Sequence, residues 1–236
     1  MFGWIYLLPL YLSRMQGYSS QQIGGVMIWI GLPQLVLIPF IPKVMKYVDS
    51  KRLVISGYFL FVIGSLLAAR LSDDFSGPQF LSANLVRAVA QGLMMAPLMG
   101  IAIAGIEHEQ AGSASALFNA LRNMGGAVGI AVIQTFLTKR EQFHSAILSA
   151  QTTLLQPSTR QRLDELSAHF LSSGVSDSAI AYREAIVAVG RDIRHEAFML
   201  GFADTVIMQS AMLALGLAAV VFVRKVSQVP AEGQGH

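Results

Sequence analysis

Residues Gly112–Thr135 read GSASALFNALRNMGGAVGIAVIQT, and this stretch decides which kind of fold the chain adopts. It is apolar enough to cross a bilayer, yet it places Arg122 about ten residues from its start, roughly 15 Å deep at a rise of 1.5 Å per residue. A charge at this depth is costly, so it normally faces a bundle interior or a watery cavity. The stretch therefore predicts a polytopic membrane protein with a polar interior.

The composition of the whole chain supports the same class. Of the 236 residues, 53% are hydrophobic and only 13% are charged, whereas a soluble domain has about 25% charged residues. The net charge of +3 reflects a few loop and tail cations and does not predict a nucleic-acid partner. The absence of cysteine excludes disulfides, cysteine-ligated zinc and thiol catalysis. No nucleotide-binding, zinc-protease or serine-hydrolase motif occurs, so we expect no enzyme activity, metal or cofactor.

Apolar runs predict an all-α membrane protein with five complete transmembrane helices and one helix truncated at its N-terminus. The truncated run, Phe2–Leu12, is about 17 Å long as a helix, whereas the hydrocarbon core is about 30 Å thick. A re-entrant or interfacial segment is the alternative for this run. The complete spans are expected at Ile23–Ile41, Leu53–Ala69, Phe80–Ile106, Gly112–Thr135 and Thr205–Val223.

The basic loop Pro42–Arg52 predicts the orientation of these spans, because lysine and arginine concentrate in cytoplasmic loops. Alternation then places the long segment before the last span outside the cell. Pro157 and Gly174 bracket a helical pattern there, and Ser176-Asp177 begins a second one, which predicts an external helical hairpin. The predicted organisation is residues 1–136 for the first five helices and 137–200 for the outer helical loop. Residues 201–225 are expected to form the last span, and 226–236 a disordered cytoplasmic tail.

Polar residues are distributed unevenly among the predicted spans. Asn84, Arg87 and Gln91 are spaced i, i+3, i+7 and therefore share one helix face. By contrast, Leu53–Ala69 and Thr205–Val223 have few polar residues and look like outer supports. The candidates for lining a substrate cavity are Trp29, Gln34, Asn84, Arg87, Gln91, Asn119 and Arg122. Close helix packing is expected at Gly125, Gly126 and Gly129, since small residues let helices approach closely.

Each candidate also has a structural interpretation. Arg87 is as well explained by a side chain that reaches the membrane surface as by cavity lining. Arg122 is equally explained by bonds to carbonyls of a neighbouring helix and by a direct transport role. The asparagines are expected mainly as hydrogen-bond partners between helices. His144 is expected to be isolated and solvated. Asp204 is expected to be a capping residue at the outer edge of the last span rather than a group that binds a proton or a cationic substrate.

Three stretches resemble a known family. They are LPLYLSRMQGYSSQQIGG (8–25), PFIPKVMKYVDSKRLVISG (39–57) and AGSASALFNALRNMGGAVGIAVIQT (111–135). Together they resemble the C-terminal half of a fourteen-helix major facilitator drug:proton antiporter of the EmrB/QacA type. In this family the second stretch forms a cytoplasmic gating loop. Here Pro42 replaces the family's glycine, and the remaining gating candidates are Lys46, Asp49, Lys51 and Arg52.

The resemblance implies proton-coupled export of small hydrophobic or cationic drugs by alternating access between two six-helix halves. It implies a multi-pass protein of the bacterial cytoplasmic (inner) membrane, energised by the proton gradient without a cofactor. The partners it implies are the lipid bilayer, an N-terminal half that is not in this chain, and a periplasmic adaptor with an outer-membrane channel. Proton coupling is expected in that other half. Because facilitator transporters bind at the interface of two halves, this chain alone should not transport. A non-transporting membrane module, or a split-transporter subunit that assembles with another chain, is the alternative.

Overall fold

The computed structural model describes residues 2–69, 77–103, 105–153 and 156–222. These residues form helices and connecting turns with no strand, as the sequence predicted. The expected tail at 226–236 lies outside the described residues. The longer elements are α1 (Phe2–Met15), α2 (Ser20–Leu37), α3 (Ile41–Met45), α4 (Ser50–Ala69), α5 (Phe80–Ile103), α6 (Ala111–Gln151), α7 (Pro157–Ser172) and α8 (Ser178–Phe222). Two 3₁₀ turns, Gly77–Gln79 and His108–Gln110, precede α5 and α6.

The chain divides into two compact units. The first unit holds the described residues up to Ile133 together with those from Val206 onward. The second unit runs from Gln134 to Thr205 and contains α7. Both α6 and α8 contribute to each unit, so each unit is described by itself.

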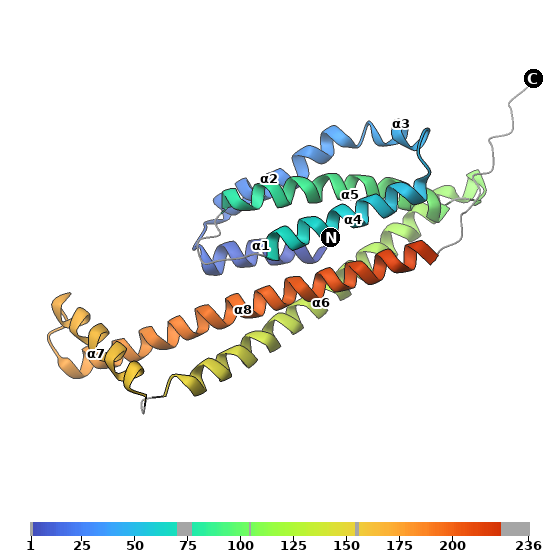
Figure 1. Ribbon diagram of the computed structural model, residues 1–236. Helices are drawn as coiled ribbons and strands as arrows, with labels where there is room; N and C mark the ends of the chain where they lie inside the picture. Colours follow the sequence, from blue (N-terminus) through green and yellow to red (C-terminus); the bar gives the residue numbers. More distant parts are fainter. Residues whose placement is uncertain (1, 70–76, 104, 154–155, 223–236) are drawn as a thin grey trace, which may run out of the picture. The chain divides into compact units, whose positions relative to one another are not determined.

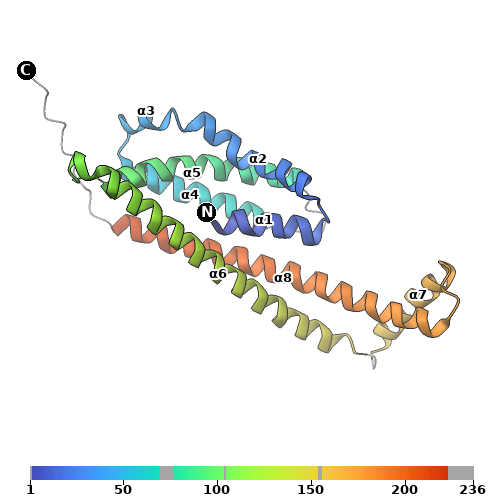
Figure 2. The same cartoon turned by 180° about the vertical axis from the view of Figure 1, so that it is seen from behind.

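Helix α5 is central to the first unit and lies between α2 and α4 (Figures 1 and 2). Two glycines on α4 allow its close approach to α5. A Cβ atom at Gly57 would lie 2.5 Å from Met94 Cγ, and one at Gly64 would lie 2.9 Å from Arg87 Cγ. Positions 57 and 64 are seven residues apart and so lie on one helix face. The helix that the sequence suggested as an outer support therefore forms a tight seam with α5.

Although α1 is short, it is deeply packed in the first unit. Its buried side chains include Trp4, Leu7, Leu8, Tyr11 and Leu12. The Phe80 ring lies 5.9 Å from the Trp4 ring and 5.5 Å from the Tyr11 ring, measured between centroids. Edge-to-face and tilted arrangements at these separations are favourable for aromatic rings. The first turn of α5 is thus held against α1.

The second predicted span differs from the helix that forms. Helix α2 begins with a capping box, in which Ser19 Oγ accepts from the Gln22 N–H and Gln22 Oε1 accepts from the Ser19 N–H. It ends at Leu37, not at Ile41. Pro39 has no N–H to continue the helical pattern, and the Phe40 N–H bonds instead to the Leu37 carbonyl at 2.9 Å. The chain then forms the separate short helix α3.

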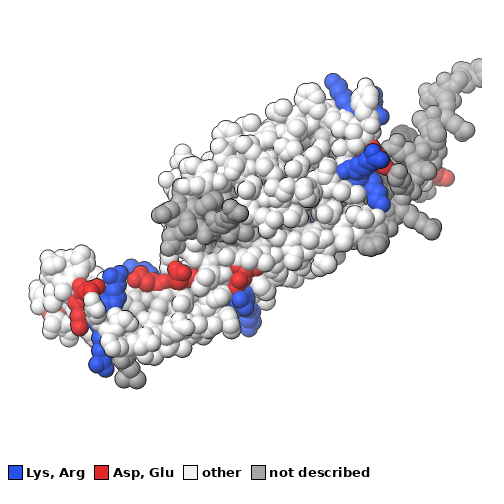
Figure 3. Space-filling view, viewed as in Figure 1, with Lys and Arg blue, Asp and Glu red and all other residues white. Residues whose placement is uncertain are grey.

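Four of the described helices are long and apolar enough to cross a membrane: α4, α5, α6 and α8. The sequence predicted five complete spans, and the helix that is not among these four is α2. It has 18 residues and begins with the polar sequence Ser-Gln-Gln. Figure 3 shows Lys and Arg gathered over α3 and the start of α4, while the surface over α2, α4 and α5 away from that end is uncharged. The chain is a multi-pass membrane protein.

The second unit contains the helices predicted between the last two spans. Helix α7 begins at Pro157 and ends at Ser172, followed by Gly174 with φ of +106°. Only glycine adopts this backbone region readily, which explains where the helix ends. Helix α8 begins at Ser178, where Asp177 Oδ1 accepts from the Ala179 N–H at 2.8 Å. The start and end of α7 and the start of α8 confirm the signals in the sequence, whereas the second predicted helix and the last predicted span form one continuous helix.

Candidate functional site

Arg87 lies in the interior of the first unit, with 1% of its surface exposed. Its guanidinium carbon is 3.4 Å from the centre of the Trp4 ring and 5.9 Å from that of Phe61. The side chain is therefore stacked between α1 and α4 and points into the bundle, not towards the surface. Cation–π attraction is strongest for tryptophan and for cations removed from water.

Asn84 connects three helices beside this arginine. Its Oδ1 accepts from Trp4 Nε1 at 3.1 Å, and its Nδ2 donates to the Val26 carbonyl of α2 at 3.4 Å. The side chain is fully buried. The expectation that Asn84 joins helices by hydrogen bonds is confirmed.

The guanidinium itself makes no hydrogen bond within the described part of the chain. Its Nε, Nη1 and Nη2 atoms are all buried without a partner, and so is the Ser65 Oγ of α4. A buried charge without hydrogen bonds is costly. Within these residues, the rings of Trp4 and Phe61 provide the compensating contacts.

Gln91 and Gln34 lie together further along α5 and α2. Gln91 Nε2 donates to Gln34 Oε1 at 3.4 Å, and both side chains are half-buried. Gln34 also borders an open hollow of about 490 Å³ along α2, lined otherwise by Ile28, Gly31, Leu32, Leu35 and Ile38. Trp29 is 44% exposed on the same helix. This part of α2 offers an apolar surface with one amide group.

The candidate residues on α6 have a different environment. Arg122 is half-buried, and its guanidinium carbon lies 5.8 Å from the Phe2 ring centre. A Cβ atom at Gly126 would lie 2.6 Å from Phe2 Cδ2, so α1 packs against this glycine. A Cβ atom at Gly125 or Gly129 would meet nothing in the described chain within 4 Å outside its own helix. Asn119 is exposed and donates to the Ser115 carbonyl of its own helix, so it differs from Asn84.

Two of the gating-loop candidates make hydrogen bonds, one local and one to a distant helix. Asp49 Oδ1 accepts from the Lys51 N–H at 3.1 Å, which satisfies a backbone donor at the start of α4. Lys51 Nζ donates to the Val221 carbonyl near the end of α8 at 2.8 Å. The Lys51 ammonium thus lies at the carboxyl end of α8, where a lysine satisfies a free carbonyl and complements the helix dipole. Lys46 and Arg52 are exposed.

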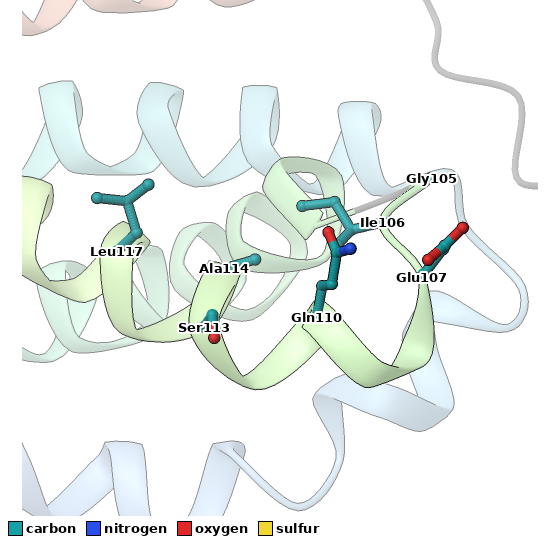
Figure 4. A pocket seen from close by; sticks show the side chains of 7 residues that line it. All are labelled: Gly105, Ile106, Glu107, Gln110, Ser113, Ala114 and Leu117. Carbon is teal, nitrogen blue, oxygen red and sulfur yellow. The ribbon is translucent and has the colours of Figure 1, made fainter.

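An open hollow of about 700 Å³ lies where α5 is followed by α6 (Figure 4). It is lined by Gly105, Ile106, Glu107, Gln110, Ser113, Ala114 and Leu117. In Figure 4 the polar groups of Glu107, Gln110 and Ser113 do not converge on one point. The hollow therefore has no arrangement suited to one small ligand.

In the second unit, Asp204 of α8 accepts two hydrogen bonds from α6. Its Oδ2 atom lies 2.6 Å from Arg140 Nε and 2.7 Å from His144 Nε2. The Arg140 guanidinium also lies over the Phe143 ring at 4.9 Å. The expectation that His144 is isolated was wrong, because α6 continues past its predicted end and brings this residue against α8.

Sequence reasoning missed Trp4 and Phe61 as partners of Arg87. Both lie in segments that the hydropathy pattern marks only as apolar. The available signal was the pair of glycines at 57 and 64, which indicates a close neighbour for that helix. For the Asp204 cluster, the signal was the i, i+4 spacing of Arg140 and His144, which places both on one helix face.

These features define a multi-pass helical membrane protein with polar contacts inside its bundle. The family model of the Major Facilitator Superfamily matches residues 1–148, and the chain belongs to this superfamily.

Relatives of known name narrow the comparison. The colistin resistance protein EmrB of Acinetobacter baumannii is 24% identical over 222 residues, covering 94% of this chain and 43% of the relative. The multidrug export protein EmrB of Escherichia coli is 27% identical over 171 residues, covering 70% of this chain and 32% of the relative. The fatty acid resistance protein FarB of Neisseria gonorrhoeae is 23% identical over 223 residues, covering 94% and 42%. The chain thus spans less than half the length of these relatives, and the EmrB/QacA-type resemblance is confirmed.

Proposed function

We propose that this chain supplies the C-terminal half of a proton-coupled multidrug efflux transporter in the bacterial cytoplasmic membrane. The observation that carries the proposal is the match of nearly the whole chain to less than half of relatives named for drug or fatty acid resistance. In facilitator transporters the substrate binds between two halves. The other half, from the same polypeptide or from a partner chain, would then complete the substrate site and provide the proton-coupling groups.

Exposure separates the cavity candidates into two groups. A residue that lines a path between two halves has to be accessible in one half alone. Trp29 and Asn119 are exposed, and Gln34, Gln91 and Arg122 are half-buried. We assign these five residues to the substrate path. Asn84 and Arg87 are buried within this half, and their role in the proposal is to fix α1 against α5.

The substrate class follows from the accessible surface. The hollow along α2 is mainly apolar and includes one amide, and its lining contains no charged side chain. Such a surface suits hydrophobic compounds that differ in shape. Weakly hydrated organic cations also fit, because the exposed Trp29 ring can attract a cation through its face.

The loop between α3 and α4 is proposed as the cytoplasmic gate. Lys51 joins the start of α4 to the end of α8, so opening this side of the half would require that bond to break. The second unit is proposed to lie in the periplasm, where it offers a surface for an adaptor protein linked to an outer-membrane channel.

The test begins with the polypeptide in membranes of the source cell. An antibody against α7 would detect a band near 25.5 kDa for this chain alone, or a band about twice that size for a joined transporter. Efflux of a hydrophobic cationic dye is then measured in efflux-deficient cells. We expect dye export from cells that hold both halves, sensitive to a protonophore, and none from cells with this chain alone. Export by this chain alone, or none with both halves, would contradict the proposal.

A further inference from the structure

A cluster in the second unit joins α6 to α8 through one carboxylate oxygen. Arg140 Nε and His144 Nε2 converge on Asp204 Oδ2 at 2.6 and 2.7 Å. Arg140 and His144 are one helical turn apart on α6, so the carboxylate of α8 bridges consecutive turns of its neighbour. The side chains of His144 and Asp204 are 17% and 28% exposed, so water reaches the cluster but does not surround it.

The backbones of α6 and α8 also meet closely beside this cluster. A Cβ atom at Gly201 would lie 3.0 Å from the Glu141 backbone nitrogen. Gly201 is three residues before Asp204 on α8, and Glu141 follows Arg140 on α6. The three polar side chains therefore lie at a point where the helices are held tightly together, and a change in their attraction acts directly on this contact.

The charged groups around His144 come from both helices. Helix α6 contributes Arg140 and Glu141, and α8 contributes Asp204. Arg194 of α8 shares a hollow of about 410 Å³ with Glu141. Arg140 remains charged at every physiological pH, whereas imidazole changes charge between about pH 5 and 8. Imidazole is thus the chemical group of the three that can change its charge in this pH range.

We propose that His144, Asp204 and Arg140 form a proton-binding site. Binding of a proton strengthens the contact between the second unit's segments of α6 and α8. An ionised carboxylate only accepts hydrogen bonds, so neutral His144 donates through Nε2–H. A proton from water then binds at Nδ1 and converts the imidazole to imidazolium. The bond to Asp204, in which only the acceptor was ionised before, becomes an ion pair between imidazolium and carboxylate and is strengthened. The contact between α6 and α8 therefore strengthens as the pH falls and weakens as the pH rises.

The experiment uses the natural absence of cysteine from the chain. Ser149→Cys and Arg194→Cys place one spin label on each helix, at residues that line the same hollow. Pulsed electron resonance then measures the distance distribution in lipid nanodiscs at several pH values. Between about pH 5.5 and 8.5 we expect the population of separated helices to rise about fivefold, as the imidazolium–carboxylate ion pair becomes a hydrogen bond from a neutral donor.

Variants at the cluster separate the proton site from simple packing. His144→Gln keeps a donor without a charge change and should show the separated population at every pH. His144→Arg keeps a permanent charge and should stay closed, so one variant remains informative if the other does not fold. Asp204→Asn should also lose the pH response, whereas Arg140→Gln should retain it. His169→Gln, on α7 of the same unit, is the matched control and should respond like the native chain.

Two results would overturn the proposal. One is a native distance distribution that does not change with pH. The other is a response that persists unchanged in His144→Gln, which would assign the effect to another group. Neither result bears on the transport proposal, because the distances are measured in this chain alone without substrate.

Discussion

The guanidinium carbon of Arg87 lies 3.4 Å from the centre of the Trp4 ring, and neither side chain is more than 2% exposed. The contact joins the first helix of the chain to the centre of the bundle. The face of the Trp4 ring stabilises part of the guanidinium charge, whose nitrogens have no hydrogen-bond partner among the described residues. Removing the two partners should therefore have unequal consequences.

Trp4→Leu should lower the thermal stability of the chain strongly. The variant loses a cation–π contact worth about 2 kcal/mol when desolvated, and it leaves Asn84 Oδ1 without the indole donor. Arg87→Met should cost less, because it removes the uncompensated charge while filling similar space. Thermal unfolding in nanodiscs measures both, and Trp29→Leu is the matched control at an exposed tryptophan. A larger loss for Arg87→Met than for Trp4→Leu would contradict this account.

The α4–α5 seam should be intolerant of a single methyl group at position 57. In Gly57→Ala the new Cβ would meet Met94 Cγ at 2.5 Å and the Ala90 carbonyl oxygen at 2.9 Å. Met94 can move, but the backbone carbonyl cannot, so overpacking should cost about 1–3 kcal/mol. Gly31→Ala on α2 meets nothing within 4 Å and should leave the unfolding temperature unchanged or higher. Equal stability of the two variants would argue against a tight seam.

The three glycines of α6 should separate into two classes. Gly126→Ala should destabilise the chain, because its Cβ would lie 2.6 Å from the Phe2 ring. Gly125→Ala and Gly129→Ala have free space and should gain about 1 kcal/mol of helix propensity. If the other half of the transporter packs on this free surface, the same two variants should impair efflux in the complete transporter. Normal efflux by both would show that no helix approaches closely there.

Lys51→Met should loosen the contact between the start of α4 and the end of α8 by removing the bond to the Val221 carbonyl. Because Lys51 is partly exposed, the effect on unfolding should be small, on the order of 1 kcal/mol or less. The sharper measurement is the reactivity of a single cysteine at Leu53, which is buried in the native chain. Its labelling rate should rise in Lys51→Met and stay unchanged in Lys46→Met, the exposed control. Equal rates in both variants would remove Lys51 from the gate.

Hydropathy and helix punctuation predicted most of the fold. The capping signals at Pro157, Gly174 and Asp177 identified the start and end of α7 and the start of α8. The end of α2 was predicted four residues late, because an apolar run across Pro39 gives no sign of which proline ends the helix. Membrane helices tolerate internal proline, as Pro97 within α5 shows.

The interior was less predictable than the spans. Helical spacing placed Asn84 and Arg87 on one face, and the structure agrees. It could not identify Trp4 as their shared partner, since that contact depends on how α1 docks against α5. Likewise, the attraction between His144 and Asp204 joins residues 60 positions apart, and no local pattern specifies such a pairing.

Arg122 offers the most direct test of the proposed substrate path. It is half-buried, and Phe2 lies 5.8 Å from its guanidinium carbon. Its Nε atom is buried without a hydrogen-bond partner in the described chain. In a complete transporter, Arg122→Ala should abolish dye efflux while membrane insertion stays normal. Arg122→Lys should also perform poorly if a planar fork of donors is needed. Asn123→Ala, an exposed neighbour, is the control for insertion and expression.

Since the Phe2 contact is long, loss of Arg122 should change the unfolding temperature little, which separates a transport role from a structural one. A variant that unfolds early and exports dye normally when stabilised would favour the structural role.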